Sequence, residues 1–320
     1  MKILITGGMG LIGHNIVAKL QHEHEIMIVD NHTNYGFIPV KEIDYLISER
    51  KTKLIKYKNC IVDIANGADI NVVFNDFKPE LVIHCASFPR QKAVSADPAW
   101  GARIMCEGLT NLLEASVRNG VRKFVYISSS MVYGDFETDV KEDATCNPIG
   151  QYGIFKYMGE KLVEDYNRRT DIEYTIIRPS AVYGELDVED RVVSKFVLGA
   201  IKGKTLKVNG PDEVLDFTYV DDAATGIVQA ALSENTTNQI YNITRSAGKQ
   251  WTLEQAAYLA LELAGGGNLE VGPRDLSFPK RGRLCIDKAI ADFGYSPKVD
   301  VPDGFKKYHT WLINSPYYNV

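Results

Sequence analysis

The sequence lacks the features that mark membrane, secreted and nucleic-acid-binding proteins. No stretch approaches the roughly 18 consecutive apolar residues of a transmembrane helix, and the apolar run at residues 3–6 is too short for a signal-peptide core. Basic residues are not in excess, since 36 Lys and Arg stand against 41 Asp and Glu, for a net charge of -5. A broad nucleic-acid surface would need the opposite balance, so we expect neither a membrane nor a nucleic-acid partner.

Cysteine is scarce, and its spacing excludes the common zinc and redox motifs. The five cysteines lie at positions 60, 85, 106, 146 and 285, and no two are within four residues of each other. Because C-x-x-C spacing is absent, we predict no metal site and no disulfide framework. Reduced thiols and the lack of a leader favour a cytoplasmic protein.

What is present is an ordinary globular composition, with 45% hydrophobic and 24% charged residues. In the first 130 residues short apolar runs alternate with amphipathic stretches, which predicts a doubly wound parallel (Rossmann) α/β sheet. The expected strands are 2–6, 25–30, 53–57, 81–85 and 123–128, and the expected helices are 11–21, 40–50, 70–77 and 99–119. A helix over 152–169 and a strand over 174–178 extend the pattern.

After Gly184 the pattern changes to predicted helices at 192–201, 221–233 and 253–263, with strands at 205–208 and 239–243. A chain of this length has room for about two domains. We therefore expect a Rossmann domain over residues 1–184, to whose sheet segments near 215–245 return. Residues 185–320 are expected to form a smaller, intertwined C-terminal α/β lobe.

A glycine-rich turn points to a dinucleotide. Gly7, Gly10 and Gly13 follow the first predicted strand at three-residue spacing and open the first predicted helix. Glycine here permits a tight turn, close approach of a pyrophosphate and close helix–strand packing, while the helix N-terminus offers free N–H groups to the phosphates. Asp30, 17 residues after Gly13 at the end of the second strand, can accept both ribose hydroxyls and repel a 2′-phosphate. The sequence therefore favours NAD over NADP.

A second group of residues suggests redox chemistry on a hydroxyl. Tyr152 and Lys156 are four residues apart at the start of a predicted helix, which places them on one face. A tyrosine with a free pKa near 10 needs a nearby positive charge to act as a base at neutral pH. Ser128–Ser130 follow a predicted strand, where a hydroxyl can hold the substrate oxygen; a serine-rich turn is the alternative.

Taken in order, the motifs resemble those of the extended short-chain dehydrogenase/reductases, in the nucleotide-sugar epimerase/dehydratase family. The resemblance spans almost all of the chain. It rests on the glycine-rich turn and on the segments 63–64, 84–87, 128–134, 152–156, 178–184, 216–222 and 287–289.

The resemblance implies roles for single residues. Tyr152 is the expected acid/base, Lys156 lowers its pKa and binds the nicotinamide ribose, and Ser129 matches the catalytic Ser or Thr. The expected NAD site comprises Tyr152, Lys156, Gly7, Gly10, Leu11, Ile12, Gly13, Asp30, Asn31, Asp63, Ile64, Cys85, Ala86, Ser87 and Pro179. Asp63 has a second interpretation, as the cap of its own turn. His84 closes a buried strand, so a core or cofactor-lining role is expected of it.

The family's dehydratases carry Thr-Asp-Glu where this chain has Ser129, Ser130 and Met131. Met131 has no proton to give, so dehydration is disfavoured. The reaction that remains is removal of a hydride from a sugar carbon and its return to the other face of that carbon. This reaction favours C4 epimerisation through a transient 4-keto sugar with tightly bound NAD. A nucleotide-sugar 4-reductase or dehydrogenase, or a C3/C5 or C2 epimerase, stays possible. A non-catalytic NAD-binding regulator is the alternative of another class.

The expected substrate is a nucleoside-diphosphate sugar, with a UDP-sugar favoured, and a diphosphate needs positive partners. Ser129, Ser130 and Met131 are expected at the sugar. Arg281 matches the family's late phosphate-binding arginine. Arg191 lies where substrate contacts are expected, and Arg90 with Lys92 could reach the sugar or phosphate; a solvated surface charge is the alternative for Arg191. By resemblance, the helices at 99–119 and 152–169 pair across a homodimer interface.

Overall fold

The computed structural model describes residues 1–33, 38–88, 90–137, 139–246 and 248–318. Within them, seven parallel strands form one sheet in the order β11-β6-β5-β4-β1-β2-β3. The strands are β1 (Lys2–Thr6), β2 (Glu25–Val29), β3 (Lys58–Cys60), β4 (Leu81–His84), β5 (Lys123–Ile127), β6 (Glu173–Pro179) and β11 (Gln239–Ile243). The order reverses between β1 and β4, as in a Rossmann sheet, which confirms the predicted fold class.

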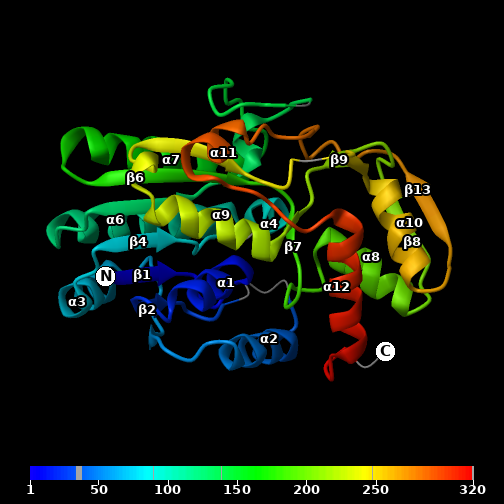
Figure 1. Ribbon diagram of the computed structural model, residues 1–320, viewed down its shortest axis with the longest axis horizontal. Coiled ribbons are helices and arrows are strands. Elements are labelled where there is room, and N and C mark those ends of the chain that lie inside the picture. Colours follow the sequence, from blue (N-terminus) through cyan, green and yellow to red (C-terminus); the bar gives the residue numbers. More distant parts are fainter. Residues whose placement is uncertain (34–37, 89, 138, 247, 319–320) are drawn as a thin grey trace.

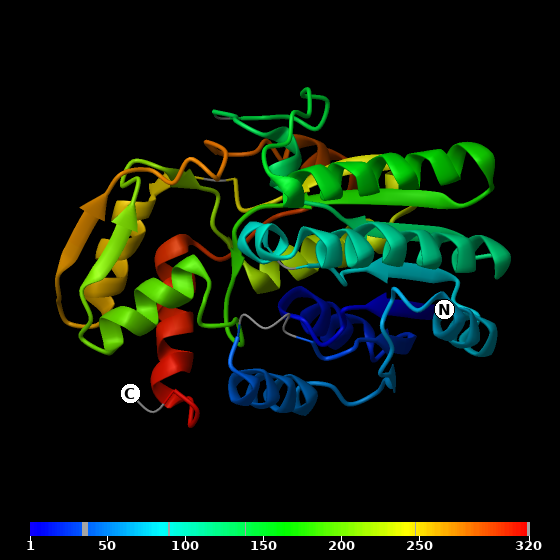
Figure 2. The same cartoon turned by 180° about the vertical axis from the view of Figure 1, so that it is seen from behind.

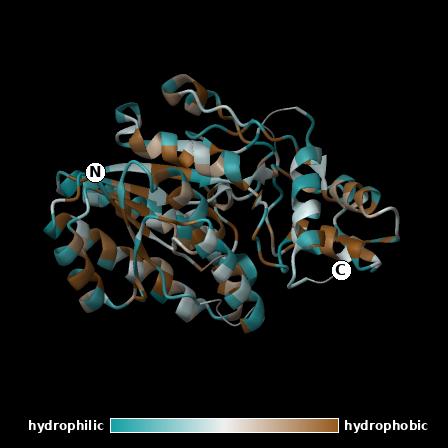
Figure 3. Cartoon of the chain, turned by 60° about the horizontal axis from the view of Figure 1, so that its bottom comes forward, coloured by the Kyte–Doolittle hydropathy of each residue, from teal (hydrophilic) through white to brown (hydrophobic). Residues whose placement is uncertain are grey.

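Helices cover both faces of the sheet (Figures 1 and 2). One face carries α1 (Leu11–Leu20), α9 (Val220–Leu232) and α11 (Asp287–Phe293), and the other carries α3 (Gly67–Phe77), α6 (Gly108–Arg118) and α7 (Gln151–Arg169). The alternation of a strand explains this division, because Ile3 and Ile5 pack under α1 and α9 while Leu4 packs under α3 and α6. Hydrophobic segments accordingly gather where helices meet the sheet (Figure 3).

The helix predicted over 99–119 is continuous but irregular. It consists of α5 (Pro98–Ala102), a π-helical turn (Arg103–Glu107) and α6. Single π turns of this kind are frequent near functional sites. Two further helices, α2 (Val40–Thr52) and α4 (Gln91–Ala96), follow β2 and β4.

The third strand lies later than predicted. Residues 53–57 do not pair with the sheet, and β3 begins at Lys58, opposite Met27. The side chain of Gln21 explains the difference, since its Oε1 accepts the N–H groups of Ile55 and Lys56 at 2.7 and 3.2 Å. These backbone groups are thus held by a side chain instead of by a neighbouring strand.

A smaller lobe lies beyond the carboxyl ends of the sheet strands (Figure 1). Its helices are α8 (Val192–Ile201), α10 (Leu253–Leu263) and α12 (Val301–Asn314). Its short strands pair as β8 (Leu206–Asn209) with β13 (Leu269–Gly272), β9 (Val214–Leu215) with β12 (Trp251–Thr252), and β7 (Val182–Tyr183) with β10 (Thr218–Tyr219). This lobe has its own apolar core, while β11, α9 and α11 return to the main sheet.

No helix in the described part of the chain is long and apolar enough to cross a bilayer.

Candidate active site

A cavity of about 920 Å³ opens at the carboxyl ends of the strands and extends into the lobe. Every residue that the sequence analysis assigned to the cofactor, the substrate or the chemistry lines this cavity. The structure therefore brings all of them together, from Gly7 near the N-terminus to Arg281 near the C-terminus. Their individual roles stay predictions.

The glycine-rich turn is packed so tightly that side chains are excluded. Gly7 has φ +67°, and a Cβ on it would lie 2.6 Å from the backbone nitrogen of Ala86. A Cβ on Gly13 would lie 2.1 Å from the carbonyl oxygen of Gly7. Gly10 is the N-cap of α1 and brings no side chain to that helix end. Its first turn therefore presents backbone to the cavity, which fits the pyrophosphate of a dinucleotide.

Asp30 holds the glycine-rich turn as well as facing the cavity. Its Oδ2 accepts the N–H of Met9 at 2.9 Å and its Oδ1 accepts the N–H of His32 at 2.8 Å. Each carboxylate oxygen has a second lone pair, which leaves room for ribose hydroxyls. Asp63 caps its own turn, since its Oδ1 accepts the N–H of Ala65 at 2.8 Å, and it also lines the cavity. The cap is thus observed, and a role of Asp63 at the cofactor stays a prediction.

Tyr152 and Lys156 lie on one face of α7, as the spacing predicts. The Lys156 Nζ is 5.9 Å from the centre of the Tyr152 ring and donates to the carbonyl oxygen of Ile127 at 2.7 Å. Lys156 is only 4% exposed, and burial lowers the pKa of its ammonium to about 8. The lysine is therefore anchored to the end of β5, directly before the serine segment.

The environment of the Tyr152 hydroxyl has opposing effects on its pKa. Burial raises that pKa, while the positive charge of Arg191 and a hydrogen bond with the Ser129 side chain lower it. Burial is the largest effect, so the pKa of Tyr152 lies above its ordinary value, and the lowering that we expected from Lys156 is not found. Ser129 is the N-cap of the short turn Ser130–Tyr133, and its Oγ accepts the N–H of Met131.

A buried ion pair ties α7 to the strands behind the site. Arg178 donates from Nε and Nη2 to the two carboxylate oxygens of Glu160, at 2.9 and 2.7 Å. The Ser128 hydroxyl donates to Oε1 of the same carboxylate at 2.5 Å. Glu160 is fully buried and Arg178 is 2% exposed. The helix that carries Tyr152 is thereby fixed against the strand that leads to Ser129.

His84 belongs to the core, as expected. It is 2% exposed, its Nδ1 lies 2.7 Å from the Thr6 hydroxyl, and burial lowers its pKa to about 3. It is not among the cavity-lining residues.

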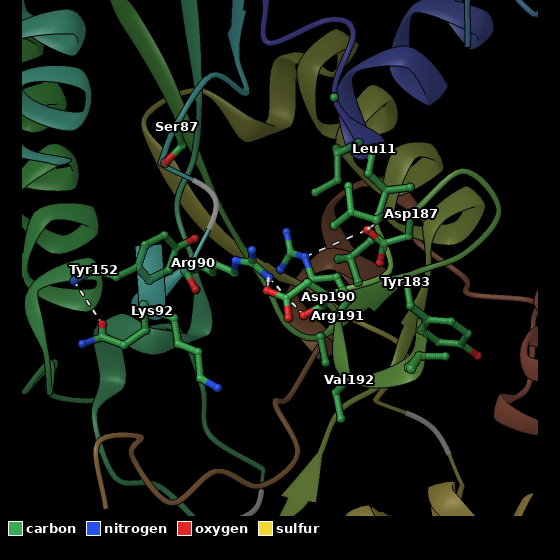
Figure 4. Close-up of a pocket in the computed structure, with 18 of the residues that line it drawn as sticks. Leu11, Ser87, Arg90, Lys92, Tyr152, Tyr183, Asp187, Asp190, Arg191 and Val192 are labelled. Carbon is green, nitrogen blue, oxygen red and sulfur yellow. Dashed lines mark hydrogen bonds and ion pairs between the residues drawn. The ribbon is translucent and has the colours of Figure 1, made fainter. Parts of the chain in front are cut away.

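The expected substrate arginines have different surroundings. Arg90 is ion-paired with Asp190 and also donates to the Asp190 carbonyl oxygen at 3.0 Å. Arg191 lies 3.9 Å from Asp187, and its Nε is buried without a hydrogen-bond partner. Burial lowers the pKa of Arg281 to about 10. Figure 4 shows Tyr152, Arg90 and Arg191 around one part of the cavity.

Two buried residues at the site escaped the sequence analysis. Arg50 donates to the carbonyl oxygens of Met9 and Leu186, at 2.7 and 2.6 Å, and so joins the glycine-rich turn to the chain entering the lobe. Asp187 is 2% exposed, and burial raises its pKa to about 6. Neither belongs to a local motif, because each acquires its contacts only through tertiary folding.

Among the residues that the structure describes, no three His, Cys, Asp or Glu side chains gather as a metal site would require.

Comparison with known sequences places the chain in a class. The sequence model of the NAD dependent epimerase/dehydratase family matches residues 3–244, so the chain belongs to this family. It is accordingly an enzyme of an NAD-dependent family, as the turn at Gly7–Gly13 and Asp30 predicted.

The individual relatives are similar to this chain at modest sequence identity. A putative UDP-glucose 4-epimerase of Methanocaldococcus jannaschii is 29% identical over 98% of this chain and 99% of its own. Among solved structures, the UDP-glucose 4-epimerase of Thermotoga maritima with UDP-glucose has a TM-score of 0.85 and 27% identity, covering 97% and 98% of the two chains. The UDP-glucuronic acid 4-epimerase of Bacillus cereus, in complex with UDP-glucuronic acid and NAD, has a TM-score of 0.89 at 26% identity, with the same coverage.

Proposed function

We propose that the protein epimerises C4 of a nucleoside-diphosphate sugar, most simply a UDP-sugar. One observation carries the proposal: Tyr152, Lys156 and Ser129 share a single cavity with the glycine-rich turn. The relatives of known name that match nearly the whole chain support the 4-epimerase assignment and the UDP group.

The position of each residue in the cavity suggests which part of the two ligands it binds. We propose that the glycine-rich turn and Asp30 hold the pyrophosphate and adenosine ribose of NAD, and that Lys156 holds the nicotinamide ribose. When bound, NAD accepts a hydride from the sugar carbon and returns it, and its oxidised ring is positively charged. Residues 1–184, with the segments near 215–245, would bind NAD, and residues 185–320 would bind the nucleotide sugar.

Tyr152 moves the proton. As a phenolate its oxygen would take the proton of the C4 hydroxyl while the C4 hydrogen leaves as a hydride, and the two losses together give a 4-keto sugar; Tyr152 would later give the proton back. Ser129 holds the same sugar oxygen and, through its hydrogen bond, stabilises the phenolate. For inversion the keto sugar must turn its other face to the cofactor.

The residues around Tyr152 also argue against water elimination. Met131 is 5% exposed and lines the cavity at the position where the family's dehydratases carry an acid. A thioether cannot protonate a leaving hydroxyl. We therefore propose that the sugar loses no water in the reaction.

We further propose a homodimer formed through α7 and the irregular helix predicted over 99–119, which ends in α6. Val117 and Ile154, on these two helices, are 37% and 47% exposed and so leave apolar surface open on each helix. Light scattering with size-exclusion chromatography would measure the mass directly.

Tyr152→Phe tests the catalytic assignment. We expect turnover to fall by about 10²–10⁴-fold, because the proton loses its acceptor, while NAD stays bound and the fold is unchanged. Tyr157→Phe is the matched control, since Tyr157 lies on the same helix but does not line the cavity. Turnover would be followed by NMR of UDP-glucose, UDP-galactose and UDP-glucuronate. Normal turnover by Tyr152→Phe would remove the assignment, and stoichiometric NADH formation would select a dehydrogenase.

A further inference from the structure

The helix that carries Tyr152 begins without a side-chain cap of its own. Its N-cap residue is Gly150, so no side chain at that position accepts an N–H of the first turn. The N–H of Ile154 donates to the carbonyl oxygen of Gly150 at 3.1 Å, which is the first turn of the helical hydrogen-bond pattern. The N–H of Tyr152, two residues earlier, has no partner within the helix and must find one elsewhere in the fold.

Gln91 supplies that partner from the neighbouring helix α4. It is the first residue of α4, lines the cavity and is 6% exposed. Its Oε1 accepts the N–H of Tyr152 at 3.2 Å (Figure 4). Its Nε2 donates to the Ser95 hydroxyl at 3.2 Å, and that hydroxyl donates to Oε1 of Gln151 at 3.3 Å. An amide suits this place because it offers an acceptor on one side and a donor on the other.

Gly150 leaves the space that the amide of Gln91 occupies. A Cβ on Gly150 would lie 2.1 Å from Nε2 of Gln91, so the amide would have to move away. The φ of Gly150 is +78°, which residues with a Cβ rarely adopt. Serine, threonine, aspartate and asparagine, the usual N-caps, would therefore displace the glutamine. The two residues are matched, because α7 gives up its own cap and receives one from α4.

We infer that Gln91 is a positioning residue for Tyr152, which caps the first turn of α7 and so holds the Tyr152 hydroxyl beside Ser129. The inference rests on the proposed function, because it takes Tyr152 as the residue that moves the proton.

The cap matters because Tyr152 is only the second residue of its helix. Helix ends fray, whereas Lys156, one turn later, is anchored separately to the carbonyl oxygen of Ile127. Loss of the cap should therefore move the Tyr152 hydroxyl relative to Ser129 and leave Lys156 in place. A displacement of about 1 Å can cost about a hundredfold in rate. Affinity for NAD, proposed to depend on Lys156 and the glycine-rich turn, should stay the same.

Direct contact with the substrate is the alternative role for Gln91, because its side chain lines the cavity. Both polar atoms of its amide have capacity for a further hydrogen bond. The two roles predict different kinetics. Loss of a contact that is equally strong in the ground state and the transition state raises KM, whereas loss of positioning lowers kcat.

The experiment compares wild type with Gln91→Met, Gln91→Glu and Gln255→Met. Methionine has the length of glutamine but offers only a weak acceptor. Gln255 is the matched control, since its Oε1 accepts the N–H of Thr252 at 3.3 Å at the start of α10 and its side chain does not line the cavity. Both Met variants thus lose one hydrogen bond at a helix N-terminus, and only Gln91→Met loses it at the site.

Three measurements are made on each variant. They are kcat and KM with UDP-glucose and UDP-glucuronate, the affinity for NAD by calorimetry, and amide hydrogen exchange over residues 151–156 by mass spectrometry.

We expect Gln91→Met to lower kcat by about 10–100-fold, with KM and NAD affinity unchanged within about threefold. Hydrogen exchange over 151–156 should become faster in this variant. Gln91→Glu should turn over at least about threefold faster than Gln91→Met, because a carboxylate also accepts the N–H and suits a helix N-terminus. Gln255→Met should keep the wild-type kcat and the wild-type exchange over 151–156.

Three results would overturn the inference. An unchanged kcat with a raised KM in Gln91→Met would make Gln91 a substrate contact. Equal losses of kcat in the two Met variants would reduce its role to general stability, and unchanged exchange over 151–156 would show that it is not the cap. Failure of the proposed function looks different, as normal turnover by Tyr152→Phe. If no sugar turns over, exchange decides, because faster exchange confined to Gln91→Met is still required.

Discussion

The buried carboxylate of Glu160 provides a quantitative test of how the site is held. It lies on α7 one helical turn after Lys156 and accepts three hydrogen bonds, two from Arg178 and one from Ser128. The substitution Glu160→Gln keeps the shape of the side chain but removes its charge. It also turns an NH₂ group toward the donors of Arg178.

The expected loss of stability is large because both partners are inaccessible to water. Breaking a buried ion pair by changing one partner leaves the other charge uncompensated, which costs about 3–5 kcal/mol. Glu164→Gln is the matched control, one turn later on the same helix. Its partner Lys161 lies 2.8 Å away, with side chains 25% and 51% exposed for Glu164 and Lys161. An exposed pair of this kind contributes about 0–1 kcal/mol.

Urea unfolding of both variants at neutral pH, followed by circular dichroism, measures the two losses. The ion pair also positions Ser128 beside Ser129, so we expect kcat to fall in Glu160→Gln but not in Glu164→Gln. Equal unfolding free energies for the two variants would refute the argument that the buried contact fixes α7 to β5 and β6.

The remaining predictions concern cofactor choice and pH. Asp30→Ala should reduce the preference for NAD over NADP by about tenfold, or roughly 1.4 kcal/mol, because a 2′-phosphate no longer meets a carboxylate. Titration calorimetry with both cofactors measures this preference. An unchanged preference would show that Asp30 is not at the ribose. Asp187 has a pKa raised from 3.8 to about 6, so its contribution to stability is complete below pH 3.8 and is lost as the pH rises through 6. Asp187→Asn should therefore raise the unfolding free energy by up to about 3 kcal/mol at pH 8 and by about half as much at pH 5. The same gain at both pH values would contradict the burial argument.

Local patterns predicted the regular elements of the sheet well. The apolar runs of β1, β2, β4 and β5 and the amphipathic pattern of α8 gave their positions within one residue. These elements depend mainly on burial of their own side chains. The third strand was misplaced because a tertiary contact, from the distant side chain of Gln21, holds residues 55 and 56.

Very short elements, and a helix that begins with proline and glycine, could not be predicted from periodicity. The strands β7, β9, β10 and β12 have two residues each, too few for any alternation. The C-terminal helix α12 contains Pro302 and Gly304 in its first turn, which weaken its helical signal. Proline is nevertheless compatible with the start of a helix, where its missing N–H has no partner to lose.

The candidate active site likewise contains residues that local patterns predict and residues that they do not. Gly7–Gly13 and the Tyr152–Lys156 pair are recognisable because their geometry is fixed by sequence spacing. Arg50 gains its role only when its guanidinium meets the Met9 carbonyl oxygen, 41 residues away in the chain. Asp187 gains its raised pKa only through burial under the lobe. Such roles depend on folding and leave no local signature.

The central claim is that one site removes a hydride from C4 and returns it to the same carbon, with Tyr152 moving the proton. Its most direct test uses a UDP-sugar with deuterium at C4 and follows both C4 epimers by NMR, with NADH monitored by absorbance. The account predicts that the 4-epimer forms with deuterium retained at C4 and without net NADH, and that Tyr152→Phe forms none. Loss of the label to solvent, or NADH in proportion to product, would contradict it.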